Sequence, residues 1–301
     1  MNLTELLLQS KYPFRELTEQ ESSSLKLTLL GILKDIIEIC KQNNLTVMLV
    51  GGSALGAVRH NGFIPWDDDI DVAMPRLDYN RFPSLLVKSF PDKYECLGAG
   101  FSDNPELGFI KVQKKGTLLR TVHETEDEKP SIAIDIFPIE NVPNNKILRF
   151  FHGCSVNVLL YISVCVKLYE KRNCPLTQVL LSDKQGRKSL KRRLFFGKLF
   201  GLFFKSSRWY KWSNKKAQKY QNYNTKQVSI PTGRRHYFGE IQERTVFSPP
   251  VKHNFEGIES CIPNNSDKYL SALYGDYMQI PPVEKREKHF ILEINFSLDD
   301  K

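Results

Sequence analysis

The sequence predicts an α+β (mixed α/β) fold in which a mixed sheet is flanked by helices, followed by a helix-rich, basic C-terminal half. Apolar residues recur at helical spacing over residues 19–44, which predicts a long N-terminal helix. Short apolar runs bounded by glycine, proline or asparagine then alternate with helical segments through roughly the first 140 residues. Hydrophobic residues make up 41% of the 301 residues, so the chain can bury a sizeable core and extensive disorder is excluded.

The turn-forming residues place the other elements. We expect strands over residues 45–50, 70–74, 109–113, 118–122 and 131–138, and helices over residues 54–60 and 77–89. Ser53 is expected to cap the first of these two helices. Pro83 must begin or kink the second, because proline lacks the backbone donor that a helix interior needs.

Two segments of the second half bear on membrane contact. Residues 150–166 carry no charged side chain, which fits either a buried core helix or a membrane-embedded segment; His152 and Asn157 favour the core helix. Residues 184–239 hold 16 of the 43 Lys/Arg residues and no Asp or Glu. Within them, residues 184–219 interleave basic and bulky apolar side chains. This pattern fits an interfacial helix on an anionic membrane or an ordinary amphipathic helix with a solvated basic face, and less well a nucleic-acid patch.

The chain shows no export pattern. The first residues lack a basic start followed by a long apolar stretch, and the six cysteines contain no Cys-x-x-Cys pair. We therefore expect free thiols and a cytoplasmic protein, at the inner face of the membrane if the basic segment binds lipid. Nucleic acid is not expected as a partner.

Four aspartates within five positions give the strongest chemical signal. On a strand, Asp67, Asp69 and Asp71 would share one face and Asp68 would point to the other. Two carboxylates ~5 Å apart repel by roughly 3 kcal/mol at an effective dielectric near 20, so the run needs a cation or strong donors. Oxygen-only ligands favour Mg²⁺ or Mn²⁺. The alternative is a solvated acidic loop or a calcium-binding turn, although Val72 stands where an EF-hand needs glycine.

Asp135 and a glycine turn add to this site. Asp135 lies in an apolar strand, where it is either a third metal ligand or general base, or is paired with a core arginine or backbone donors. Gly51-Gly52-Ser53 joins a strand to a helix, and free amides at a helix N-terminus favour phosphate. Ser53 precedes Asp69 by 16 residues, which lets two neighbouring strands bring the turn and the acidic run together.

The block Leu49–Pro75, LVGGSALGAVRHNGFIPWDDDIDVAMP, strongly resembles the LicD family, which includes phosphocholine transferases and fukutin-related proteins and is nucleotidyltransferase-like. Ile134–Pro138 is similar to the family's third-carboxylate strand. Its C-terminal signature is matched by Tyr269-Leu270, Tyr274–Met278 and Pro281-Pro282, followed by Arg286 and His289. The resemblance covers residues 20–140 and 255–290, whereas residues 150–250 match no motif of the family.

The resemblance implies a role for each matching residue. Asp69, Asp71 and Asp135 would be catalytic, and the metal ligands would be Asp67, Asp69, Asp71 and Asp135. The phosphate and the donor would meet Gly51, Gly52, Ser53, Arg59 and Trp66. For Arg59 the alternatives are a phosphate contact and a salt bridge to the acidic run. For Trp66 they are packing and stacking on a base or a quaternary ammonium.

The resulting prediction is a metal-dependent phosphotransferase. It would move a phospho-alcohol group, phosphocholine among the candidates, from a CDP-activated donor to a sugar of a cell-surface glycopolymer such as capsule, teichoic acid or lipopolysaccharide, with the acceptor free or lipid-linked. Two alternatives stay open: transfer of an NMP group to an acceptor, and a non-catalytic membrane-associated scaffold. We expect a catalytic core over residues 1–145, a helical basic insert over 146–250 and a C-terminal segment over 251–301 that packs back on the core.

Overall fold

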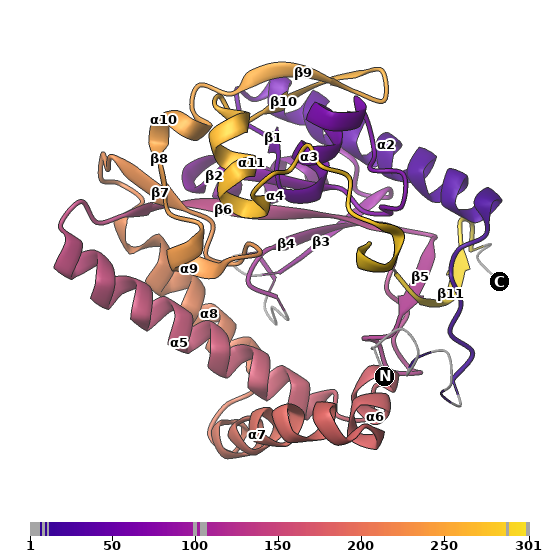
Figure 1. Cartoon of the computed structure of the whole chain (residues 1–301). Coiled ribbons are helices and arrows are strands. Elements are labelled where there is room, and N and C mark those ends of the chain that lie inside the picture. Colours follow the sequence, from indigo (N-terminus) through magenta and orange to yellow (C-terminus); the bar gives the residue numbers. More distant parts are fainter. Residues whose placement is uncertain are drawn as a thin grey trace.

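The computed structural model, which describes residues 7, 10, 12–98, 101–102, 107–286 and 289–298, has a mixed sheet between two groups of helices (Figure 1). The sheet runs in the order β1-β2-β6-β4-β3, with β7 paired to β6 and β8 to β7. Strands β2 and β6 are parallel, and the other pairs are antiparallel. The strands are β1 (Met48–Leu49), β2 (Asp71–Pro75), β3 (Tyr94–Gly98), β4 (Ile110–Lys114), β6 (Ala133–Val142), β7 (Gln227–Ser229) and β8 (Gln242–Glu243). The predicted mixed α+β fold is confirmed.

One side of the sheet is covered by the predicted N-terminal helices and by a C-terminal helix (Figure 1). These are α2 (Glu19–Gln42), α3 (Gly51–His60), α4 (Arg76–Ser89) and α11 (Ser266–Tyr274). Thr18 begins α2 with a reciprocal capping box to Glu21, and the apolar stripe of α2 lies buried against the sheet. Pro83 lies inside α4.

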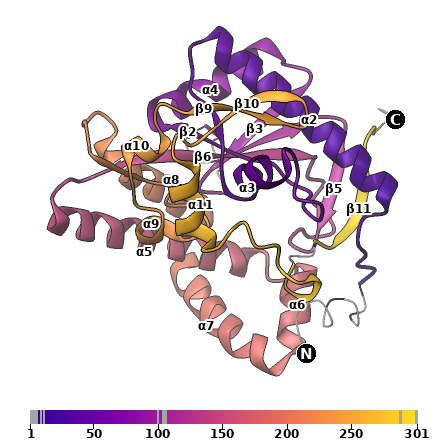
Figure 2. The ribbon, with the colours of Figure 1, turned by 45° about the horizontal axis from the view of Figure 1, so that its top comes forward.

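The other side of the sheet carries the helices of the basic segment (Figure 2). They are α5 (Lys146–Glu170), α6 (Pro175–Ser182), α7 (Lys184–Gly201) and α8 (Ser206–Ala217), followed by the short η1 (Gln218–Tyr220) and α9 (His236–Gly239). The short helix α10 (Arg244–Phe247) instead packs against α11. Helix α5 contains the uncharged run 150–166. One side of it is buried: His152 Nδ1 lies 2.8 Å from the Tyr237 hydroxyl and its Nε2 lies 2.9 Å from the Lys216 carbonyl. The opposite side is exposed, so the predicted core helix is only half buried.

The C-terminal residues return to the sheet. The hairpin β9 (Val251–Phe255) and β10 (Ile258–Ile262) packs on β1, and α11 packs against α3. Beyond η2 (Val283–Lys285), β11 (Ile291–Asn295) pairs with β5 (Leu118–Thr121) in a separate two-stranded sheet. The predicted boundaries near residues 145 and 250 stay predictions.

Three local predictions were wrong. The strand expected over 45–50 is only Met48–Leu49, because the Thr46 amide donates to Asp78 Oδ2 at 2.9 Å. Helix α3 begins at Gly51 with Val50 as its N-cap, so Ser53 is not the cap. The shared strand face expected for Asp67, Asp69 and Asp71 is also wrong, because Asp67 lies in a turn, where its amide donates to the Ile64 carbonyl at 2.9 Å. The strand itself begins at Asp71, one residue from its predicted start.

Candidate active site

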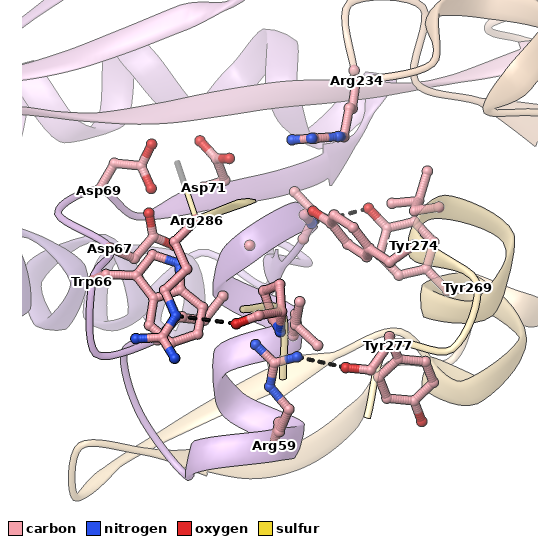
Figure 3. Close-up of a pocket in the computed structure, with 18 of the residues that line it drawn as sticks. Arg59, Trp66, Asp67, Asp69, Asp71, Arg234, Tyr269, Tyr274, Tyr277 and Arg286 are labelled. Atoms are coloured by element: carbon pink, nitrogen blue, oxygen red, sulfur yellow. Dashed lines mark hydrogen bonds between the residues drawn. The ribbon is translucent and has the colours of Figure 1, made fainter. Parts of the chain in front are cut away.

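A cavity of about 410 Å³ gathers most of the predicted site. It lies where the N-terminus of α3 and the acidic run face α11, residues 230–240, residues 276–286 and His289. Figure 3 shows the carboxyl groups of the acidic run together at one side of this cavity. The predicted residues that line it are Gly51, Gly52, Arg59, Trp66, Asp67, Asp69 and Asp71. Asp67, Asp69 and Asp71 therefore meet, although the turn and not strand alternation brings them together.

The central carboxylates crowd one another. Asp71 and Asp135 stand opposite each other on the parallel strands β2 and β6. Desolvation, together with Asp69 and Asp135, raises the pKa of Asp71 well above its ordinary value. Desolvation in the cavity and the charges of its acidic neighbours also raise the pKa of Asp69, although Asp69 is exposed to solvent and screening weakens these effects. This arrangement favours a cation beside the carboxylates.

Asp135 does not line the cavity and has a cationic partner. Lys111 on β4 stands in register with Asp135, and its Nζ lies 3.2 Å from Asp135 Oδ1. Desolvation raises the pKa of Asp135, and the ammonium of Lys111 opposes this shift. The predicted ion pair thus exists, with lysine in place of arginine. The role of Asp135 as a metal ligand stays a prediction.

The glycine turn lies directly against the acidic run. Gly51 has φ +55°, a left-handed conformation that favours glycine, and its amide donates to the Tyr269 hydroxyl at 3.1 Å. A Cβ at Gly51 would lie 3.3 Å from Asp71 Oδ2, and one at Gly52 would lie 3.0 Å from Asp67 Oδ2. The absence of both side chains therefore lets the carboxylates approach the positive end of α3.

Ser53 is placed differently from the prediction. It is buried, does not line the cavity, and accepts a hydrogen bond at 2.8 Å from the Asp71 amide through its hydroxyl. Ser53 thereby fixes the start of β2 relative to α3. Its predicted phosphate contact stays a prediction.

Comparisons with known proteins agree with this geometry. Residues 44–152 match the model of the LicD/FKTN/FKRP nucleotidyltransferase domain. We call these residues the LicD domain, after the model that they match. The lipopolysaccharide cholinephosphotransferase LicD of Haemophilus influenzae is 27% identical over 281 residues, which cover 89% of this chain and 95% of that protein. The predicted LicD resemblance and the predicted enzyme class, a LicD-like phosphotransferase, are confirmed.

Shorter matches lie in two uncharacterized proteins. One, from Rickettsia typhi, is 40% identical over 60 residues, covering 20% of this chain and 19% of that protein. The other, from Rickettsia prowazekii, is 33% identical over 86 residues, covering 27% of this chain and 32% of that protein.

Two residues of the LicD domain connect it to the C-terminal segment. Arg59 Nη1 donates to the Tyr277 carbonyl at 2.6 Å (Figure 3). Burial lowers the pKa of Arg59. In the described part of the chain it forms no ion pair with the acidic run, so that alternative is wrong. The Arg286 guanidinium lies 4.2 Å above the Trp66 ring. This face of the indole is therefore occupied by a cation, and Trp66 does more than pack against the core.

The cavity wall outside the LicD domain supplies residues that the sequence alone did not assign. Arg234 lies 5.5 Å from the Tyr274 ring, and Figure 3 shows its guanidinium extending toward the side of the cavity that holds the acidic run. Lys285 and Arg286 also line the cavity. Arg234 falls in the stretch without a known motif, and only the turn signal Pro231-Thr232-Gly233 before it was visible in the sequence.

Asp68 also belongs to this region. It is hydrogen-bonded to His289, and the hydrogen bond with Asp68 raises the pKa of His289 to about 9. One ligand atom from each of Asp67, Asp68 and His289 lies within 4.8 Å of the others. At neutral pH His289 is therefore protonated and offsets part of the charge of the acidic run.

Proposed function

We propose that this chain transfers a phospho-alcohol group, with phosphocholine as the first choice, from a CDP-activated donor to a sugar hydroxyl of a cell-surface glycopolymer. The Haemophilus influenzae relative is named as a lipopolysaccharide cholinephosphotransferase, which supports phosphocholine as the group and lipopolysaccharide as the acceptor to test first. The observation that carries the proposal is the approach of the acidic run to the Gly51-Gly52 turn within one cavity.

The donor set fits Mg²⁺ or Mn²⁺. Asp67, Asp69 and Asp71 offer only oxygen atoms, and Asp135 stands beside Asp71 on the neighbouring strand. These four residues would hold the ion, which would relieve the crowding that raises the pKa of Asp71. When bound, the ion would neutralise charge on the diphosphate of the donor.

The rest of the cavity suits an anionic ligand with a cationic head. Arg59, Arg234, Lys285 and Arg286 line it and can meet phosphate oxygens. Amides at the start of α3, which begins at Gly51, add partial positive charge at the same end. Aromatic rings in the wall can receive a quaternary ammonium.

The proposed reaction is a displacement at phosphorus. An oxygen of the sugar hydroxyl forms a bond to the β-phosphorus, the bond from this phosphorus to the bridging oxygen breaks, and CMP leaves. The hydroxyl proton passes to Asp69 or Asp71, which line the cavity. The glycine turn and the arginines orient the diphosphate and stabilise the charge that develops on CMP.

We place this reaction in the cytoplasm, at the inner face of the membrane, with a glycan acceptor that is free or lipid-linked. The acceptor named for the Haemophilus influenzae relative, lipopolysaccharide, is compatible with a membrane-proximal enzyme.

A donor screen tests the proposal. Thermal shifts would be recorded with CDP-choline, CDP-ethanolamine, CDP-glycerol, CDP-ribitol and NTPs, each with Mg²⁺ and with EDTA. We expect a metal-dependent rise with one CDP-alcohol, abolished in Asp69→Asn and Asp71→Asn and retained in the exposed control Asp127→Asn. A response to NTPs alone would favour NMP transfer, and no metal-dependent response would favour the scaffold.

A further inference from the structure

The outer side of α5 exposes an apolar stripe. Phe151, Val158 and Tyr161 follow one another at spacings of seven and three residues, which places them on one face of the helix. Phe151 is 63% exposed and Val158 is 56% exposed. The opposite face is fixed in the protein by His152 and by Gly153, whose Cβ position is filled by the Tyr237 ring. One apolar face of α5 is thus left without cover in the described structure.

Helix α7 extends this stripe. The Tyr161 ring lies 6.5 Å from the Phe196 ring, which in turn lies 5.7 Å from the Phe195 ring. Phe195 is 64% exposed, and Leu199, one turn further, is exposed as well. Past the end of α7, Phe203 is 67% exposed. We call these exposed apolar side chains together the α5–α7 face; it comprises Phe151, Val158, Tyr161, Phe195, Leu199 and Phe203.

The charges at this face have one sign. Lys191 and Arg192 are exposed and lie four and three residues before Phe195, so they border the stripe on the same side of α7. Residues 184–239 contain 16 Lys/Arg and no Asp or Glu, while the rest of the chain has 27 Lys/Arg against 34 Asp/Glu. Positive charge is therefore concentrated where the apolar side chains are exposed.

We infer that the α5–α7 face is a docking surface for an anionic membrane, on which the protein lies peripherally. The apolar side chains enter the boundary between headgroups and acyl chains, and the bordering cations meet anionic headgroups. A second copy of the chain is disfavoured because a two-fold contact would bring the same cations face to face. Nucleic acid accounts for the cations but not for exposed phenylalanines and leucines. This inference is independent of the proposed transfer reaction.

The face does not fit a membrane-spanning arrangement. Helix α5 is long and apolar enough to cross a bilayer by length and composition. However, α7 and α8 pack against it and carry many Lys/Arg residues, which would be costly in the hydrocarbon core. In both ribbon views these helices lie together on the side of the sheet away from α2 (Figures 1 and 2).

Vesicle co-sedimentation of the full chain, without donor or acceptor, tests the inference. Vesicles of phosphatidylglycerol and phosphatidylcholine would be compared with pure phosphatidylcholine at about 0.1 M and about 0.5 M NaCl. We expect binding to the anionic vesicles that weakens with salt. The pair Lys191→Gln, Arg192→Gln should weaken it about 30-fold. The pair Phe195→Ser, Phe203→Ser should weaken it at least about tenfold.

Matched variants on the other side of the molecule separate this surface from general charge and hydrophobicity. Lys34→Gln with Lys41→Gln removes two exposed cations from α2, and Leu27→Ser with Leu77→Ser removes two exposed leucines. Both controls should bind as the wild type does, and all variants should keep the wild-type circular dichroism and Tm.

Three results would overturn the inference. One is equal binding to neutral and anionic vesicles, or none to either. Another is a loss of binding in the control pairs as large as in the α7 pairs. The third is binding to a DNA duplex or a concentration-dependent dimer, abolished by the α7 variants, in place of vesicle binding. Because no substrate is present, failure here leaves the transfer reaction unaffected.

Discussion

Asp71→Asn should stabilise the metal-free protein at the same time as it abolishes transfer. Asp71 faces Asp135 in register on parallel strands, which are about 5 Å apart. Two carboxylates at that separation repel by about 3 kcal/mol at an effective dielectric of 20. Lys111, 3.2 Å from Asp135, cancels part of this repulsion. A net gain of about 2 kcal/mol for the neutral, isosteric asparagine corresponds to about 4 °C in Tm for a chain of this size.

The size of the stabilisation depends on pH. Burial and its acidic neighbours hold the pKa of Asp71 well above its ordinary value in the folded protein. The folded state therefore binds a proton that the unfolded state releases, so the contribution of Asp71 to the free energy of unfolding is greatest below about pH 4 and falls as the pH rises. Asparagine cannot ionise, so the advantage of the variant should be small at about pH 4, near the pKa of the unfolded carboxyl group, and largest at about pH 8.

Thermal unfolding in EDTA, recorded at both pH values, measures this difference. Asp127→Asn, which changes an exposed carboxylate far from the cavity, serves as the control and should show no such pH-dependent gain. Adding Mg²⁺ should raise the Tm of the wild type and leave Asp71→Asn nearly unchanged. A metal-free variant that is less stable than the wild type at pH 8, or equally shifted at both pH values, would refute the reasoning.

Two further substitutions test other parts of the account. Gly52→Ala places a methyl group 3.0 Å from Asp67 Oδ2, so turnover should fall about tenfold to 100-fold with little change in Tm. The control Gly31→Ala on α2, which has open space around the added methyl group, should retain full activity. Glu140→Gln leaves Arg76 buried without its ionised partner, and we expect urea unfolding to report a loss of about 3 kcal/mol or more. An unchanged urea midpoint for Glu140→Gln would contradict the buried ion pair, and full activity of Gly52→Ala would contradict the close approach of turn and acids.

Local sequence patterns were sufficient for the acidic side of the site. The glycine turn and Asp71 are near each other because one short helix, α3, connects β1 to the neighbouring strand β2. The sequence spacing between the turn and the acidic run predicts this arrangement. The place of Asp135 beside Asp71 depends on the parallel pairing of β2 and β6, which the two apolar runs alone did not predict. The alternation argument nevertheless failed for Asp67 and Asp69, because both residues precede β2 and Asp67 lies in a turn.

The opposite wall of the cavity depends on tertiary packing that no local pattern carries. Arg234 reaches the site because β7, from the stretch without a motif, adds to the core sheet. Arg286 was visible in the C-terminal signature, yet its position above Trp66 depends on how that segment returns to the sheet. Likewise, the uncharged run 150–166 predicts a helix, but only the packing of His152 shows which face is buried and which is exposed.

The central claim is transfer of the β-phosphorus, and isotopic label can follow it directly. The wild-type protein would be incubated with Mg²⁺, a lipopolysaccharide or glycan acceptor, and CDP-choline labelled with ³²P at either the α- or the β-position. We predict that only the β-label reaches the acceptor, that the α-label is released as CMP, and that EDTA or Asp69→Asn abolishes both. Appearance of the α-label on the acceptor would contradict phosphocholine transfer and indicate nucleotidyl transfer instead.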